Sequence, residues 1–166
     1  MHRIFLVGYM GSGKTAMGKL LAKRLGLTFI DLDSYIENKF RCTIANIFQQ
    51  DGEAAFREIE KKFLHEVAEI EDVVIATGGG APCFFDNMDF MNRRGETIYI
   101  KLTPEHLAKR LSSSKAGVRP LIRDKSGEVL LQYITQTLKN REPYYMQSKR
   151  IIEGTDTEIK RQILES

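Results

Sequence analysis

Residues 8–15 read Gly-Tyr-Met-Gly-Ser-Gly-Lys-Thr and follow directly on the apolar stretch Ile-Phe-Leu-Val at residues 4–7. The spacing G-x-x-x-x-G-K-[ST] is typical of a loop that curls around phosphate groups, because glycines let backbone N–H groups point inward. In such a loop Lys14 reaches the β and γ phosphates, and Thr15 offers its hydroxyl to Mg²⁺. A following helix presents the positive end of its dipole. The run therefore predicts a nucleoside triphosphate site, and the alternative is a glycine-rich turn without a ligand.

Segments typical of strands and helices alternate along the chain. Apolar runs predict strands at 4–7, 28–30, 73–76, 97–102 and 150–152. Helical spacing of apolar residues predicts a first helix that stops at Gly26. Further helices are predicted over 34–50, with a break near 41–43, and over 54–70, over 86–94, after Pro104, around 130–138 and over 155–164. This alternation predicts parallel βαβ units, whose ligands gather at the carboxyl ends of the strands. Apolar residues show no regular spacing over 112–124, which predicts a mobile loop.

Composition narrows the class of protein. A chain of 166 residues has the usual size of one domain, and we expect a single domain over 1–166. No apolar run approaches the roughly 18 residues of a membrane span, and no signal-peptide pattern occurs, so we expect a cytoplasmic protein that does not bind membranes. The net charge of +3 without a dense basic run argues against nucleic-acid binding. Cys42 and Cys83 have no metal-ligand spacing, so we expect small buried thiols. Nothing such as a heptad seam requires an oligomer, and we expect a monomer.

Two of the predicted strands end in polar or glycine-rich segments. Asp31 and Asp33 lie one residue apart, so on an extended strand end both point the same way, one toward Mg²⁺ and one toward an acceptor hydroxyl. The alternative is that Asp33 or Ser34 caps the next helix. The strand at 73–76 runs into Gly78-Gly79-Gly80 instead of an acidic residue, which argues against a motor or switch ATPase. The three glycines either let a ligand approach the backbone or form a sharp turn.

Three arginines are candidates for binding anions. Arg57 lies between Glu53 and Glu60 at helical spacing, an arrangement that a solvated salt-bridge ladder explains equally well. Arg141 is either a ligand-binding residue or a cation at a helix end. Arg119 precedes Pro120 and lies in a simple turn, unless the segment closes over the site, where its charge would neutralise the transferring phosphate.

Together these segments resemble the shikimate kinase family over nearly the whole chain. The resemblance rests on six segments in order, which are Gly8–Thr15, Asp31–Asp33, Phe56–Glu60, Gly78–Gly80, Arg119–Leu121 and Arg141–Tyr145. It implies a three-layer α/β P-loop kinase with a five-stranded parallel sheet of the nucleoside-monophosphate-kinase type. It also implies substrate-binding helices near 33–70 and a mobile lid near 112–124. The implied reaction moves the γ-phosphate of ATP to the 3-hydroxyl of shikimate, in the pathway to chorismate and aromatic amino acids.

The resemblance also implies a role for each site residue. On the acceptor side, Asp33 would hold the hydroxyls and either take the proton or only orient the hydroxyl. The carboxylate would be gripped by Arg57 and Arg141, and the backbone of Gly79 and Gly80 would contact the substrate. ATP would be held by Gly11, Ser12, Gly13, Lys14, Thr15, Ala16, Arg110 near adenine, and Arg119 from the lid. Lys14 and Arg119 would join Asp33 in catalysis, while Thr15 and, through water, Asp31 would serve Mg²⁺.

Two other functions stay open at this point. A related small-molecule kinase such as gluconate kinase needs similar groups, although the segments 56–60 and 78–80 argue against it. A nucleotide-dependent regulatory module would be expected to carry an N-K-x-D segment or an acidic strand end, and the sequence has neither.

Overall fold

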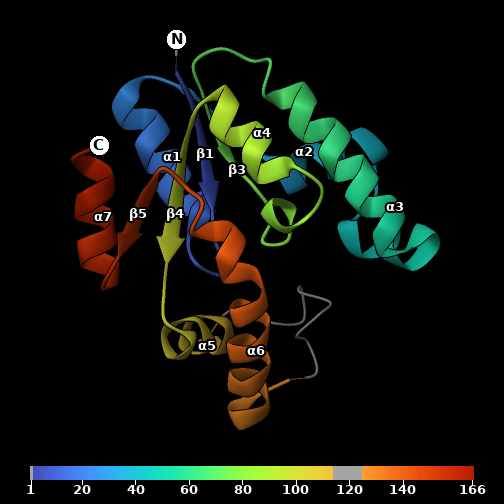
Figure 1. The fold of residues 1–166 in the computed structure, drawn as a ribbon, viewed down its shortest axis with the longest axis vertical. Coiled ribbons are helices and arrows are strands. Elements are labelled where there is room, and N and C mark those ends of the chain that lie inside the picture. Colours follow the sequence, from blue (N-terminus) through green and yellow to red (C-terminus); the bar gives the residue numbers. More distant parts are fainter. Residues whose placement is uncertain (1, 114–124) are drawn as a thin grey trace.

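The computed structural model describes residues 2–113 and 125–166. Its five strands form one parallel sheet in the order β2-β3-β1-β4-β5 (Figure 1). The strands are β1 (Arg3–Val7), β2 (Thr28–Asp31), β3 (Val73–Ala76), β4 (Glu96–Lys101) and β5 (Arg150–Glu153). Every residue of β3 and nearly every residue of β1 is buried, as continuous apolar runs require when helices cover both faces of a sheet. The predicted five-stranded parallel sheet is therefore confirmed.

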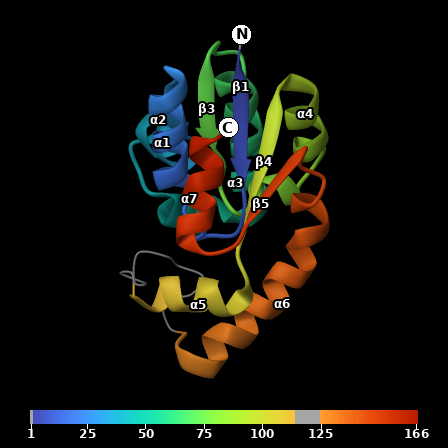
Figure 2. The same cartoon turned by 90° about the vertical axis from the view of Figure 1, so that its left-hand side faces the viewer.

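Helices cover both faces of this sheet. They are α1 (Lys14–Leu25), α2 (Leu32–Phe40), α3 (Ile44–Val67), α4 (Asn87–Arg94), α5 (Pro104–Ser113), α6 (Gly127–Tyr145) and α7 (Asp156–Leu164), with a short 3₁₀ turn η1 (Ala81–Cys83). Figures 1 and 2 show α1 and α7 on one face, with α3 and α4 on the opposite face. The predicted three layers are confirmed. Helices α5 and α6 lie beyond the carboxyl ends of the strands, at the bottom of Figure 1.

The phosphate loop joins β1 to α1. Gly13 is the residue before the helix and has φ 96° and ψ 18°, a left-handed conformation that favours glycine. Its carbonyl accepts from the N–H of Met17, so the helix begins directly at Lys14. Gly26 ends the helix, again in the left-handed region, and its N–H reaches the carbonyls of the last turn as predicted. The first turn of α1 therefore points its N–H groups at the loop.

The junction of β2 and α2 differs from the prediction. Asp31 is the N-cap residue, and its carboxylate accepts from the N–H of Ser34 at 3.0 Å. The chain becomes helical at Leu32, so the expectation that Asp31 and Asp33 share an extended strand end is wrong. The alternative that Asp33 or Ser34 caps the helix is also wrong. An aspartate at the N-cap position accepts a hydrogen bond from the otherwise unpaired N–H three residues later, and Asp31 does so as the last residue before the helix.

The long helical region after α2 follows the prediction more closely. The expected break at 41–43 is present, and Thr43 caps α3 by accepting from the N–H of Asn46 at 3.1 Å. The two helical segments predicted around residues 50 and 54 are joined in α3, with a kink at Gly52, where φ is 87° and ψ is 169°. The kink turns the second part of α3, which carries Arg57 and Glu60.

Part of the predicted lid lies outside the described residues. Residues 114–124, which include Arg119, belong to that part, while residues 112 and 113 are the last residues of α5. Among the residues that the structure does describe, no helix is both long enough and apolar enough to cross a membrane. Cys42 and Cys83 are free and half-buried, so the expected thiols are less deeply buried than predicted.

Candidate active site

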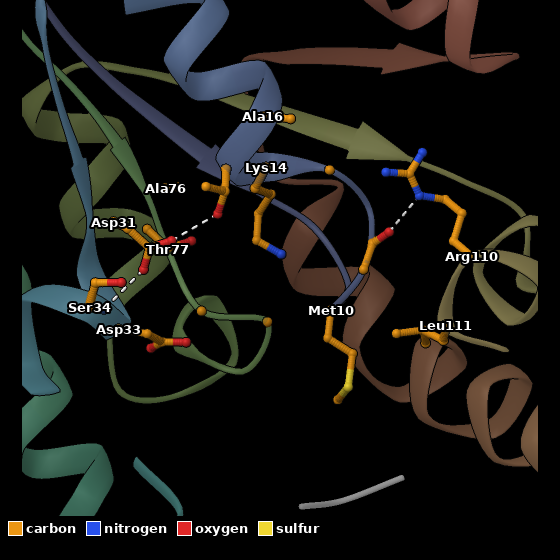
Figure 3. Close-up of a pocket in the computed structure, with 15 residues that line it drawn as sticks. Met10, Lys14, Ala16, Asp31, Asp33, Ser34, Ala76, Thr77, Arg110 and Leu111 are labelled. Carbon is orange, nitrogen blue, oxygen red and sulfur yellow. Dashed lines mark hydrogen bonds between the residues drawn. The ribbon is translucent and has the colours of Figure 1, made fainter. Parts of the chain in front are cut away.

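A cavity of about 740 Å³ lies at the carboxyl ends of β1, β2 and β3, with the phosphate loop as one wall (Figure 3). The predicted nucleotide residues that line it are Gly11, Gly13, Lys14, Thr15, Ala16 and Arg110. Asp31 and Asp33 line the opposite side. Ser12 is buried and does not line the cavity, and Arg119 lies outside the described residues. The cavity thus gathers residues from four separate segments of the chain.

Lys14 extends across the loop into this cavity. Its Nζ donates to the carbonyl of Gly8 at 2.7 Å and to that of Tyr9 at 2.9 Å. Figure 3 shows Asp31 and Asp33 on one side of Lys14 and Arg110 on the other. The positive charge is therefore held over the loop, where a phosphate would replace the two carbonyls as its partner.

Thr15 and Asp31 form a possible metal-binding pair. The Thr15 hydroxyl donates to Oδ2 of Asp31 at 2.8 Å, and Oδ1 of the same carboxylate caps α2. Hydroxyl and carboxylate oxygens are the hard ligands that Mg²⁺ takes together with phosphate oxygens and water. The pair lines the cavity next to Lys14, so these donors fit a magnesium ion that bridges to phosphate.

Arg110 lies on the far side of the loop and links three elements. Its Nε donates to the carbonyl of Gly11 at 2.8 Å, and its Nη1 pairs with Asp156 at 2.8 Å. His106 approaches the same Asp156 oxygen at 3.0 Å. This network joins α5 to the loop and to the start of α7. Asp156 is not predictable as a site residue from the sequence, because nothing in its local pattern distinguishes it from an ordinary acidic residue in the first turn of a helix.

A second cavity of about 380 Å³ adjoins the first. Met10, Asp33, Gly78 and Gly79 line both cavities. All five residues predicted for the acceptor side line the second one, and they are Asp33, Arg57, Gly79, Gly80 and Arg141. They come from α2, α3, the turn after β3, and α6. The fold thus brings together residues that are more than 100 positions apart in the sequence.

Arg57 is held in place by acids and an aromatic ring. It pairs with Glu60 at 2.9 Å and with Glu53 at 3.1 Å, and its guanidinium lies 4.3 Å from the ring centre of Phe84. The predicted salt-bridge ladder therefore exists, but the expectation that it is solvated is wrong, because Arg57 is only 6 % exposed. The turn after β3 covers it: a Cβ at Gly80 would lie 2.5 Å from Nη2 of Arg57, so only glycine permits this approach.

Two carboxyl groups in the second cavity have raised pKa values. Burial raises the pKa of Asp33 to about 6, helped by the negative charge of Asp31 and opposed by Lys14. Burial also raises the pKa of Glu60 to about 7, although Arg57 opposes the shift. Glu60 is fully buried, and among the described residues its Oε2 has no hydrogen-bond partner. Carboxyl groups with pKa values near neutrality are suited to accept or donate protons.

Arg141 is the second cation of this cavity, and its surroundings differ from those of Arg57. It lies within α6, and its guanidinium is 5.8 Å from the ring centre of Tyr9. Within residues 2–113 and 125–166, no carboxylate lies within ion-pair distance of it. It lines the cavity, which argues against a mere helix-end cation. Among the described residues, the cavity therefore contains one positive charge without an acid within ion-pair distance.

The chain is similar to known proteins over nearly its whole length. The sequence profile of the family described as "Shikimate kinase" matches residues 10–166. A shikimate kinase from Parabacteroides distasonis is 58 % identical over 145 residues, which cover 87 % of this chain and 83 % of that protein. A shikimate kinase crystal structure from Bacteroides thetaiotaomicron has a TM-score of 0.92 and 46 % identity, covering 99 % of this chain and 95 % of that one. Another, from Acinetobacter baumannii in complex with shikimate, has a TM-score of 0.89 and 34 % identity, covering 99 % and 90 %.

These matches span nearly the whole chain at up to 58 % identity, and the solved structures share its fold. The chain belongs to the shikimate kinase family.

Proposed function

We propose that this chain transfers the γ-phosphoryl group of ATP to the 3-hydroxyl of shikimate, releasing shikimate 3-phosphate and ADP. The observation that carries the proposal is the position of Asp33, which lines both the phosphate-loop cavity and the cavity with the two arginines. One carboxylate thus faces a donor site and an acceptor site at once. The relative from Acinetobacter baumannii, which is described in complex with shikimate, supports the choice of acceptor.

In this proposal the acceptor carboxylate binds between Arg57 and Arg141. An arginine guanidinium can donate two parallel hydrogen bonds to a carboxylate, and this pairing orients a cyclic acid in the site and contributes to its affinity. The charge of Arg57 is already balanced by Glu53 and Glu60, whereas Arg141 has no such acid among the described residues. Arg141 therefore supplies most of the electrostatic attraction, and Arg57 mainly supplies geometry. Gly79 and Gly80 contact the ring through their backbone.

Asp33 is the proposed proton acceptor or orienting group for the 3-hydroxyl. A carboxylate with a pKa near 6 is mostly ionised at neutral pH, yet it is basic enough to accept a proton as the oxygen attacks. Lys14 and the N–H groups of the loop hold the phosphate in line, and Arg119 would neutralise its charge from the lid. Bound Mg²⁺ would screen the β and γ phosphates, held by Thr15 and, through water, Asp31.

We also propose a role in the reaction for each part of the chain. Residues 1–166 form one kinase domain, in which the helices near 33–70 bind the acceptor and residues 112–124 act as the lid. The active form in this proposal is the monomer.

A coupled assay of ADP release with ATP, Mg²⁺ and shikimate tests the function. We expect ADP release that depends on shikimate, with little turnover of gluconate in a parallel reaction. The variant Asp33→Asn should bind ATP as the wild type does, yet lose at least about a hundredfold in turnover, the usual contribution of a positioned base. Preference for gluconate would support the related kinase, and ADP release without any acceptor would support a regulatory module.

A further inference from the structure

Tyr145 connects two of the proposed acceptor-side residues through a single hydroxyl group. It is the last residue of α6 and is fully buried. Its hydroxyl donates to the carbonyl oxygen of Gly79, and the same hydroxyl interacts electrostatically with the Arg141 guanidinium. Gly79 follows β3 and Arg141 lies within α6, so this hydroxyl is the point where the turn and the helix meet in the site.

The bond to Gly79 has a consequence for the next residue. In a trans peptide the C=O and the following N–H point in opposite directions. Since the Gly79 carbonyl points to Tyr145, the N–H of Gly80 points away from it. No acceptor for the Gly80 N–H is found in the part of the chain that the structure describes, and both glycines line the second cavity. The Tyr145 hydroxyl thus sets the direction of a backbone donor that is available to a ligand.

The surroundings keep this hydroxyl in one orientation and one protonation state. The ring of Tyr145 packs against Tyr99, with ring centres 5.1 Å apart. Burial raises the pKa of Tyr145, so the group stays protonated and remains a donor at neutral pH. On the other side, a Cβ at Gly79 would lie 3.2 Å from the backbone nitrogen of Met10, so the turn rests against the phosphate loop. Movement of the turn is restricted on both sides.

We propose that Tyr145 is a positioning residue of the acceptor site, whose hydroxyl holds the Gly79–Gly80 peptide and the Arg141 guanidinium in the orientation that receives the substrate. The inference rests on the proposed function, since it concerns binding of shikimate. Tyr145 itself does not line either cavity, so it acts through its two neighbours and not by touching the substrate.

The variant Tyr145→Phe tests this role, because it keeps the ring and removes only the hydroxyl. Tyr99→Phe is a matched control: Tyr99 is equally buried, and its hydroxyl donates at 2.7 Å to Glu142, which lines neither cavity of the site. We expect Tyr145→Phe to raise the KM for shikimate by up to about tenfold, the upper effect of one hydrogen bond between neutral groups. The KM for ATP and the kinetics of Tyr99→Phe should stay near the wild-type values.

A double-mutant cycle with Arg141→Ala separates positioning from general loosening of the fold. If Tyr145 acts partly through Arg141, its removal should raise the KM for shikimate less in the Arg141→Ala background than in the wild type. Kinetics are measured well below the unfolding midpoint of the least stable variant, so that a loss of stability does not enter KM. Equal changes in both KM values, or the same rise for Tyr99→Phe, would overturn the role of Tyr145. A wild type without shikimate-dependent turnover would overturn the proposed function itself.

Discussion

Replacing Asp33 with asparagine should stabilise the protein above pH 6 while it abolishes most of the activity. Burial raises the pKa of Asp33 from 3.8 to about 6, so ionising this group in the folded state costs about 2 to 3 kcal/mol relative to the unfolded chain. Between those two pKa values the folded state binds more protons than the unfolded state, so stability falls as the pH rises. An asparagine cannot ionise and avoids this cost. The gain should be absent below pH 3.8 and complete above pH 6.

Thermal unfolding followed by circular dichroism at pH 4 and pH 7.5 measures this effect. The protein must be free of nucleotide and Mg²⁺, because bound ligands shift the unfolding midpoint by themselves. At pH 7.5 we expect Asp33→Asn to unfold roughly 4 to 12 °C above the wild type, given about 2 to 4 °C per kcal/mol for a chain of this size. Asp51→Asn is the control, since Asp51 is exposed on α3. A lower midpoint at pH 7.5, or the same shift at both pH values, would refute the reasoning.

Three further substitutions test the site and the fold. Arg57→Ala and Arg141→Ala should both raise the KM for shikimate, but only Arg57→Ala should lower stability by about 3 to 5 kcal/mol, because it leaves the buried Glu60 without its partner. Equal unfolding midpoints for the two variants would contradict this difference. Gly80→Ala should displace the Arg57 guanidinium and raise the KM for shikimate without changing that for ATP, as steady-state kinetics will show. Thr155→Ala removes the capping box of α7 and should cost about 1 kcal/mol in thermal unfolding, while Thr155→Ser should not.

Most of the fold could be predicted from local patterns. The apolar runs of β1 and β3 and the glycine at the end of α1 act within a few residues, and each element formed where its own sequence favours it. The error at Asp33 has a different cause. Asp31 is both the last residue of β2 and the N-cap of α2, so whether Asp33 is extended or helical depends on where β2 stops pairing with β3, which is a contact between distant segments. Local sequence does not contain that information.

The acceptor site also combines features that local sequence predicts with features that it does not. The spacing of Arg57 and Glu60 predicts an ion pair but says nothing about solvent, because burial depends on the turn after β3 that covers the guanidinium. Likewise Tyr145 reads as one aromatic residue near a helix end. Its contact with Gly79 joins residues 66 positions apart and is visible only in the folded chain.

Local patterns and the order of motifs are enough to predict the phosphate loop, the alternation of strands and helices, and the resemblance to shikimate kinases, because these features depend on residues that are close together in the chain or on motifs in a set order. The folded chain alone shows that Asp33 lies between two cavities and that two carboxyl pKa values rise toward neutrality. It also shows that Arg57 forms ion pairs with two acids, whereas Arg141 has no acid within ion-pair distance among the described residues. These properties come from desolvation and from charges on neighbouring elements. Both arise when the parallel sheet brings the ends of its strands together at one edge.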